Sequence, residues 1–231
     1  MKELTVTYLE HSGFAVRCAD DLLVFDYFRD PAERLPVLIE KAKRILFFSS
    51  HAHSDHFVAT IGNWQNQVRA YILSEDIHAV SGMGSVAHEK IIYCKPYQRI
   101  ALDDLTIETY GSTDAGVSFC VALNGWRIFH AGDLNRWHWT GDTPANRKQA
   151  DAAWRRELAK VAGLTMDLAF FPVDQRLGEY RAAGVKEFCD QVRVKQLVTM
   201  HSNGAPWQPP FDFPVPVWSP LHAGEEFVMQ R

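Results

Sequence analysis

The sequence contains no long apolar run, no block of basic residues and no closely spaced cysteines, and each absence argues against a class of protein. No stretch approaches the roughly 18 consecutive apolar residues of a membrane helix. The four cysteines are scattered without a CxxC pair, which is typical of reduced thiols rather than of a disulfide framework or a thiolate metal site. No basic block exceeds a pair, and the net charge of −4 argues against a nucleic-acid partner.

The bulk composition predicts one soluble globular domain that spans residues 1–231. A chain of 231 residues with 47% hydrophobic and 23% charged residues can bury a sizeable core and fold as a single unit. The N-terminal residues alternate in polarity and include Glu3, whereas a secretory signal needs about 7 to 15 apolar residues. We therefore expect a cytoplasmic protein with a small-molecule substrate and no membrane partner. Its oligomeric state does not follow from the sequence.

The clearest chemical signal lies in residues 51–56, which read His-Ala-His-Ser-Asp-His directly after the apolar run at residues 45–48. A strand that ends in such a turn presents several donors to one point, because side chains stop alternating between faces where the strand ends. Buried imidazole and carboxylate groups are costly unless they are paired or bind a metal. We therefore predict that His51, His53, Asp55 and His56 bind a metal ion, and zinc, manganese and iron suit these ligands.

The hydrophobic pattern predicts strands interrupted by a few helices. Asn124-Gly125 is a favoured two-residue hairpin turn, and Thr143-Pro144 is a typical helix start. Six of the eleven prolines fall between Pro206 and Pro220, which predicts an extended loop. The predicted strands are 4–9, 14–18, 22–25, 45–48, 71–73, 105–110, 117–123, 126–130, 168–171 and 196–200, and the predicted helices are 31–43, 143–162 and 185–194.

Two further strand ends carry ligand-type residues. Asp133 follows the predicted strand 126–130, and Gly132 before it would let the backbone turn the carboxylate inward. His201 ends the predicted strand 196–200. Each residue alone is ordinary, since Gly-Asp is a common turn and a histidine at a strand end is unremarkable. Their order after the histidine turn makes them candidates to complete a two-metal site.

The HxHxDH pattern of residues 51–56 resembles the signature of the metallo-β-lactamase superfamily. The resemblance implies an α/β fold, a four-layer αββα sandwich, with a metal site at one edge. It further implies one or two bound ions, zinc in the first place and manganese or iron as alternatives. The ligands that it implies are His51, His53, Asp55, His56, Asp133 and His201.

The sequence departs from the family pattern at one position. The family has another histidine at the strand end before Val117, but residues 109–116 contain none. One explanation is that an oxygen of Ser112, Thr113 or Asp114 replaces the imidazole, which would favour manganese or another hard ion. A second is that His51 and His53 hold a more weakly bound ion. A third is that the protein uses mainly the site built from Asp55, His56, Asp133 and His201. Asp114 is also interpreted as an ordinary turn residue.

Other segments resemble the small bacterial metal-dependent hydrolases grouped with L-ascorbate-6-phosphate lactonase. They lie at residues 8–14, 23–26, 131–135, 171–174 and 200–201. This resemblance implies a small polar substrate, with or without a phosphate group. His11 and Asp26 in these segments are interpreted either as a pair that orients metal ligands or as caps of strand ends.

Residues after the strand ends are candidates for substrate binding. The aromatic loop at 137–139 would shape a pocket or form a structural cluster. Arg176 could bind a carboxylate or phosphate with its two-pronged guanidinium, although a surface salt bridge explains it equally well. The predicted substrate-binding residues are Ser112, Asp114, Trp137, His138, Asp174, Arg176 and Asn203.

Together these patterns predict a metal-dependent hydrolase that uses a metal-bound hydroxide on an ester or lactone, with Asp55 and Asp133 as the catalytic carboxylates. Three alternatives stay open. A nuclease or phosphodiesterase of the same fold would share the ligands, although the sequence contains no basic accessory segment. A non-enzymatic metal-binding or sensing protein would explain the missing histidine. An iron-dependent redox member would normally carry a flavodoxin-like domain.

Overall fold

The computed structural model describes residues 2–80, 82–210 and 212–231, and the chain divides into two compact units. The first unit comprises Met1–Lys95 and Leu221–Arg231, and the second comprises Pro96–Pro220. Each unit contains one seven-stranded sheet. The expectation of one hydrolase domain over residues 1–231 stays a prediction.

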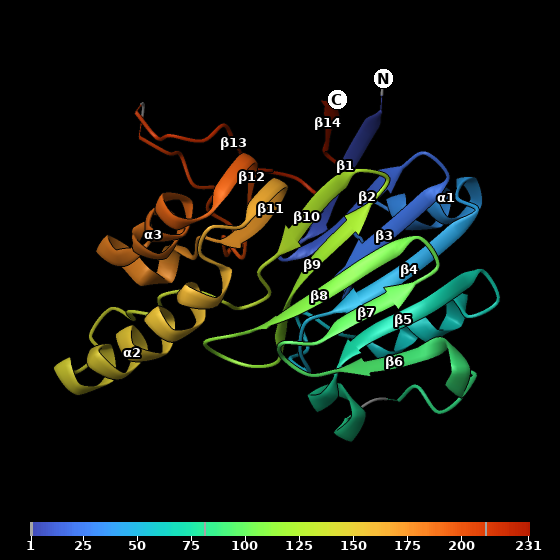
Figure 1. Ribbon diagram of the computed structural model, residues 1–231, viewed down its shortest axis with the longest axis horizontal. Helices are drawn as coiled ribbons and strands as arrows, with labels where there is room; N and C mark the ends of the chain where they lie inside the picture. Colours follow the sequence, from blue (N-terminus) through green and yellow to red (C-terminus); the bar gives the residue numbers. More distant parts are fainter. Residues whose placement is uncertain (1, 81, 211) are drawn as a thin grey trace. The chain divides into compact units, whose positions relative to one another are not determined.

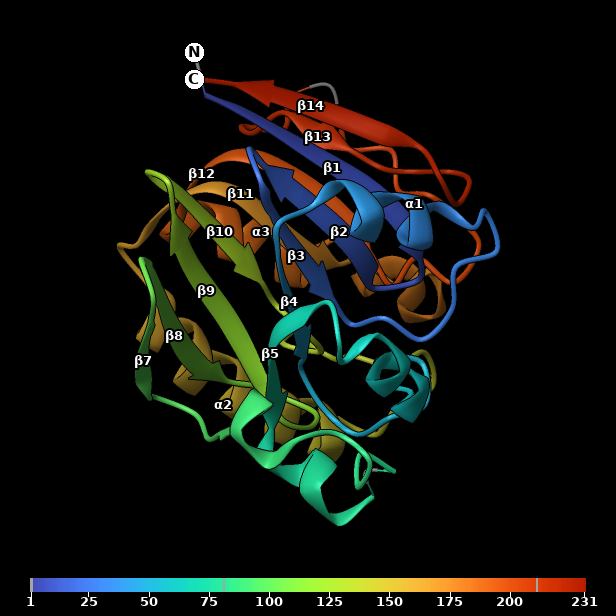
Figure 2. The ribbon, with the colours of Figure 1, turned by 90° about the vertical axis from the view of Figure 1, so that its right-hand side faces the viewer.

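The sheet of the first unit has the order β14-β1-β2-β3-β4-β5-β6, and Figure 2 shows β1 to β5 in this sequence across the sheet. Strands β14, β1, β2 and β3 pair antiparallel, whereas β3, β4, β5 and β6 pair parallel. Strands β1, β3, β4 and β5 therefore end at the same edge. The bounds are β1 Glu3–Glu10, β2 Gly13–Cys18, β3 Asp21–Phe25, β4 Arg44–Ser49, β5 Val68–Ser74, β6 Ile91–Cys94 and β14 Glu226–Gln230.

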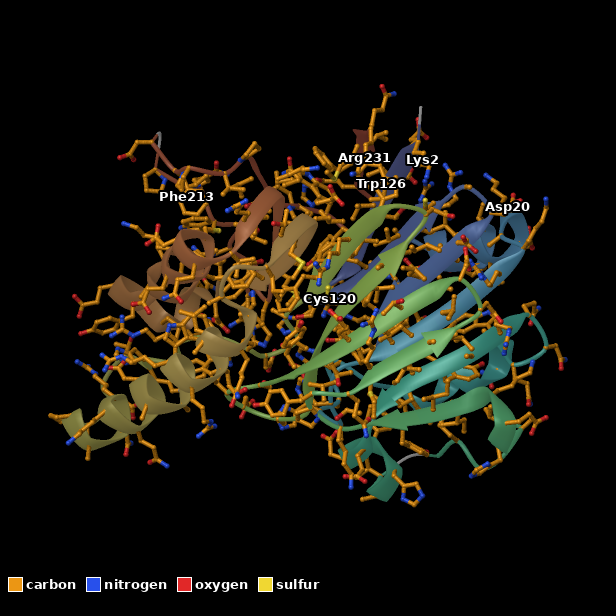
Figure 3. The ribbon with its side chains drawn as sticks, viewed as in Figure 1. Lys2, Asp20, Cys120, Trp126, Phe213 and Arg231 are labelled. Carbon is orange, nitrogen blue, oxygen red and sulfur yellow. The ribbon has the colours of Figure 1, made fainter. Side chains whose placement is uncertain are left out.

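The C-terminal strand β14 forms one edge of the first sheet. Lys2 and Arg231 exchange two backbone hydrogen bonds of 3.0 and 2.9 Å, and Figure 3 shows them next to each other. Side chains of β14 alternate between exposed and half-buried, as expected for an edge strand. The local sequence pattern does not predict this strand, because its pairing partner β1 lies more than two hundred residues away in the chain.

Helix α1, Arg34–Lys41, packs against the first sheet through the buried residues Leu35, Leu38 and Ile39. The predicted helix at 31–43 is longer than the observed one. It starts late because Glu33 adopts a left-handed conformation and the Asp30 carboxylate accepts a hydrogen bond from the Leu35 amide, at 2.6 Å. Short 3-10 helices at Ala59–Trp64, Glu75–Ala79 and His88–Lys90 connect the later strands of this unit.

The sheet of the second unit repeats the same plan, with the order β13-β12-β11-β10-β9-β8-β7. Strands β7 to β10 pair antiparallel and β10 to β13 pair parallel, so β8, β10, β11 and β12 end at one edge. The bounds are β7 Arg99–Leu102, β8 Leu105–Gly111, β9 Val117–Leu123, β10 Trp126–His130, β11 Thr165–Pro172, β12 Arg193–Met200 and β13 Val217–Trp218. The β9–β10 turn at Asn124-Gly125 has two positive φ angles, 52° and 84°, which confirms the predicted hairpin.

Helices α2, Pro144–Val161, and α3, Ala183–Gln191, lie side by side next to the second sheet (Figure 1). Phe188 of α3 anchors the contact, since its ring lies 5.4 Å from that of Phe129 and 4.7 Å from that of Phe171. Trp154 of α2 is fully buried and donates a hydrogen bond to Glu187 of α3, at 2.6 Å. A 3-10 helix spans Gln175–Tyr180.

Most predicted elements are present, and the differences are local. Helix α3 is shifted toward the N-terminus relative to the predicted 185–194, because β12 already begins at Arg193. Strands β6, β7 and β13 were not predicted, since each is only two to four residues long. Among the described residues, none of the helices has the length and apolar character needed to cross a membrane.

Candidate metal centre

In the first unit, ligand-type residues gather where neighbouring strands end. His11 follows β1, Asp26 follows β3, and residues 51–56 follow β4. The three strands end at one edge because β1 and β3 are both antiparallel to β2, while β4 is parallel to β3. In the second unit Asp133, Asp174 and His201 follow β10, β11 and β12 in the same way. Polar groups at the carboxyl ends of parallel strands are the usual place for a site in such sheets.

Asp26 is a fully buried carboxylate that fixes two histidines of the turn. It accepts hydrogen bonds from Nδ1 of His56 at 2.8 Å and from Oγ and the amide of Ser50, both at 2.7 Å. Because the Ser50 hydroxyl proton points to Asp26, Ser50 Oγ accepts from Nδ1 of His51, at 2.9 Å. Both imidazoles therefore carry their proton on Nδ1 and present Nε2 as the basic nitrogen. A carboxylate behind the imidazole is typical of metal-binding histidines.

His51 and His53 lie with their ring nitrogens close together. Nε2 of His51 is 2.9 Å from Nδ1 of His53, and the ring planes are nearly perpendicular, at 82°. Two nitrogen lone pairs at this distance repel each other unless a proton or a cation lies between them. His51 is buried whereas His53 is exposed, so the pair spans from the interior to the surface of the first unit.

A second group of donors in the first unit consists of His11, Asp55 and His56. Each offers one ligand atom, and these atoms lie within 4.8 Å of one another. Nε2 of His11 is 3.4 Å from Oδ2 of Asp55. The hydrogen bond from His11 is the main reason why the pKa of the Asp55 carboxyl lies well below its usual range, and the nearby His56 adds to it. Asp55 is therefore ionised at neutral pH.

In the second unit, the loop after β10 holds Asp133. Gly132 has a φ of 54°, which confirms that a glycine makes the bend before the aspartate. Thr113 ties this loop to the β8–β9 turn, because its Oγ donates to the carbonyl of Asn135 at 2.6 Å and accepts from the Asn135 amide at 2.9 Å. The indole of Trp137 donates to the carbonyl of Asp133, at 2.9 Å. The carboxylate is thus carried on a rigid loop.

His201 is held by a second carboxylate, as His56 is in the first unit. Its Nδ1 donates to Oδ2 of the fully buried Asp174 at 2.9 Å, and its Nε2 lies 3.7 Å from Oδ1 of Asp133. Burial of Asp174 opposes ionisation, but hydrogen bonds from His201 and Arg176 more than offset it and hold the pKa of this carboxyl well below its usual range. His201 itself adopts a strained left-handed conformation, with a φ of 53°.

The predicted substrate-binding residues lie at several places in the second unit. Asp174 and Arg176 bind each other, with Arg176 Nη2 2.6 Å from Oδ2, while Arg176 also stacks on Trp139 at 5.1 Å. His138 is buried and donates to Asp151. Trp137 packs against the His201 ring, and the backbone carbonyl of Asn203 accepts from Gln175. Ser112 is half-buried and Asp114 is exposed in the β8–β9 turn. A substrate-binding role for all of them stays a prediction.

The donor chemistry of both units fits a divalent metal ion. Imidazole Nε2 atoms and carboxylate oxygens are the ligands that zinc, manganese and iron take in proteins. In each unit a buried carboxylate fixes a histidine with Nε2 directed away from it, which a purely structural histidine does not require. His53, Asp55 and Asp133 supply further donors.

His11 lies among the ligand-type residues of the first unit. Its Nε2 is 3.4 Å from Oδ2 of Asp55, which agrees with the interpretation that it orients a metal ligand, and its ring also offers a donor atom to the group with Asp55 and His56. Its backbone φ of 56° was a signal that only the structure reveals, since such a conformation is uncommon for histidine. Asp26 was also grouped with His11, whereas the structure pairs it with His56 and Ser50.

Solved structures share the fold of this chain at low sequence identity. The metallo hydrolase Igni18 from the archaeon Ignicoccus hospitalis is 18% identical, with a TM-score of 0.69 over 99% of both chains. The metallo-β-lactamase fold protein YhfI from Bacillus subtilis is 14% identical, with a TM-score of 0.61 over 99% of this chain and 100% of its own. A diphosphatase from the PhnP family is 12% identical, with a TM-score of 0.59 over 99% of this chain and 98% of its own.

These likenesses show that the chain has the metallo-β-lactamase fold, and they confirm the predicted α/β class with the αββα sandwich of that fold. The sequence matches no protein family model, and no curated protein resembles it significantly.

Proposed function

We propose that this protein is a metal-dependent hydrolase. The observation that carries the proposal is the buried carboxylate behind each of two histidines, Asp26 behind His56 and Asp174 behind His201. Burying these carboxylates costs free energy. A role in orienting the Nε2 atom of each histidine toward a metal ion explains why they are buried. The fold agrees, since the similar structures include proteins described as metal-dependent hydrolases.

We assign the metal ligands from the family resemblance and add one residue to them. The resemblance implies His51, His53, Asp55, His56, Asp133 and His201 as metal ligands. We propose His11 as a further ligand, because its nitrogen shares a donor group with Asp55 and His56. This residue would add an imidazole beside Asp55 and His56, and not beside His51 and His53, which belong to another donor group. One or two ions, of zinc, manganese or iron, suit this donor set.

A bound divalent ion would activate water and polarise the scissile carbonyl or phosphoryl group. The residues of the chain prepare this chemistry. Asp55 is a carboxylate and is ionised at neutral pH, so it acts as a ligand or proton acceptor rather than as an acid. Asp26 and Asp174 keep the imidazoles oriented, and Trp137 holds the backbone of Asp133 in place.

The proposed substrate is a small polar ester or lactone, and a phosphodiester or pyrophosphate is the second candidate. The diphosphatase among the similar structures favours the second candidate, because it shares the fold over almost the whole chain. We also propose a cytoplasmic location and no nucleic-acid partner. All four cysteines are free thiols, three of them buried, which fits a reducing compartment.

The test is a hydrolysis assay on protein purified without chelators. A panel of lactones, carboxylic esters, phosphodiesters and pyrophosphates should include at least one substrate whose turnover stops after chelation and returns with zinc or manganese. His56→Ala should abolish turnover, while the matched variant His88→Ala, at an exposed histidine of a 3-10 helix, should retain it. Full metal content with no turnover of any substrate would instead favour a metal-binding or sensing protein.

A further inference from the structure

The second unit contains a cationic pocket apart from the residues assigned above to the metal. It has a volume of about 590 Å³ and lies against the exposed face of α2, whose position is visible in Figure 1. Arg147, Lys148 and Arg155 of α2 line it, with His138 and Tyr180 from the neighbouring loops. The volume falls within the roughly 300 to 1,000 Å³ of small-molecule sites.

The acidic residue of the pocket is already paired. Asp151 accepts hydrogen bonds from Nε of Arg136 and Nε2 of His138, both at 2.7 Å. Arg136 also donates to Glu187, at 2.6 Å. Burial of Asp151 opposes ionisation, yet these partners lower the pKa of its carboxyl. Asp151 and Glu187 therefore form ion pairs with Arg136, and they do not neutralise the positive charges of Arg147, Lys148 and Arg155 on α2.

The side chain of Arg147 is fixed in position by Tyr180. Its Nη1 donates to the Tyr180 hydroxyl at 3.0 Å, and its guanidinium carbon lies 4.9 Å from the centre of the Tyr180 ring. Its Nε is buried and makes no hydrogen bond to any part of the chain that the structure describes. A guanidinium fixed on an aromatic ring loses little conformational entropy when it binds an anion.

Lys148 and Arg155 add two charges beside it. Their positions differ by seven, so they lie about two turns apart on one side of α2, and Arg147 flanks the same side. Both side chains are exposed, and neither forms an ion pair with the residues described in the structure. Three cations around one concavity repel each other, and an anion in the pocket removes that repulsion.

We propose that this pocket binds a small phosphate-bearing molecule, with the phosphate group between Arg147, Lys148 and Arg155. Several cations at one concave site suit the multiple charges of phosphate better than a single carboxylate. The rings of Tyr180 and His138, 5.2 Å apart, offer a surface for the rest of the ligand. The inference does not depend on the proposed hydrolase activity, because none of the three cations is a proposed metal ligand.

The experiment measures binding by isothermal titration to the full chain after the metal has been stripped and the chelator dialysed away. The probes are inorganic phosphate, pyrophosphate, succinate and a short single-stranded RNA. We expect pyrophosphate to bind more tightly than phosphate, and both more tightly than succinate. Lys148→Gln/Arg155→Gln should weaken pyrophosphate binding at least tenfold, as a rough figure for two charge-assisted contacts. Both side chains are exposed, so the variant should keep its fold, which circular dichroism checks.

The matched control is Lys160→Gln, because Lys160 is an exposed cation of α2 that contacts Tyr97 rather than the pocket. It should bind pyrophosphate like the wild type. Absence of phosphate and pyrophosphate binding would overturn the proposal, and so would an equal loss in the control variant. Tighter binding of RNA than of pyrophosphate would identify an extended nucleic-acid surface and would also overturn it. Failure of the hydrolase assay alone would leave these binding results unchanged.

Discussion

Asp26 and His56 form a fully buried hydrogen-bonded pair, with 2.8 Å between Oδ2 and Nδ1 and no exposed surface on either residue. Through Ser50 the same carboxylate also fixes His51. One aspartate at the end of β3 thus sets the tautomer of two histidines at the end of β4.

Asp26→Asn should weaken metal binding by about 10- to 100-fold, because the amide accepts more weakly than the carboxylate and no longer fixes the two imidazoles. Competition with a chromogenic chelator measures the affinity. The matched control is Asp20→Asn. It removes an exposed carboxylate of the β2–β3 turn that forms an ion pair with Lys43, and it should leave the metal affinity unchanged. An unaltered affinity in the Asp26 variant would contradict the role given to this residue.

Gly184→Ala should distort the loop that carries Asp133. A Cβ at Gly184 would lie 1.9 Å from the side-chain oxygen of the buried Asn135 and 3.0 Å from the Arg136 amide, so the loop after β10 must move. We expect the free energy of unfolding to fall by about 1 to 3 kcal/mol, as for an overpacked core, and metal affinity to fall with it. Chemical denaturation and chelator competition measure the two effects.

The control for this substitution is Gly84→Ala. A Cβ at Gly84 meets no atom within 4 Å, so both quantities should match the wild type. Normal metal affinity in the Gly184 variant would show that the position of this loop does not determine how Asp133 contributes to metal binding.

Three cysteines should be unreactive in the folded protein. Burial raises the pKa of Cys94 and Cys189 to about 12 and that of Cys120 to about 11, from an ordinary 9.0. A thiol reagent near pH 8 should therefore modify these three slowly, whereas all four thiols should react rapidly in denaturant. Rapid modification of the three in the folded protein would contradict the raised pKa values of their thiols.

The same shifts predict a loss of stability at alkaline pH. The raised folded pKa values mean that the unfolded chain releases protons first, so the stabilising contribution is complete below about pH 9 and is lost as pH rises toward 11 to 12. Denaturation midpoints should fall over this window. A midpoint that stays constant or rises between about pH 9 and 11 would be inconsistent with the shifts.

The sequence predicts the histidine turn and the two later strand ends because each has a local sequence pattern, which is a cluster of histidines or a ligand-type residue after an apolar run. No local pattern indicates the role of His11. Its contact with Asp55 depends on β1 and β3 both being antiparallel to β2, which is a property of the sheet and not of the hairpin sequence.

The sequence does not predict the pairing of Asp26 with His56 either, because this contact also depends on how the strands pair in the sheet. The positions of the two residues differ by 30 and helix α1 lies between them, so only the parallel register of β3 with β4 brings their strand ends together. The pocket on α2 was not predicted either, because a helix with alternating charges is normally interpreted as a solvated face. Only the structure shows that Asp151 turns toward Arg136 and His138 rather than toward Arg147 and Arg155.

The most direct test of the central claim is the element-resolved metal content of protein purified without chelators, compared with the double variant His56→Ala/Asp133→Ala. The account predicts one or two ions of zinc, manganese or iron per wild-type chain and none in the double variant, while His88→Ala retains the wild-type content. Full retention of metal by the double variant, or a metal-free wild-type protein, would contradict it.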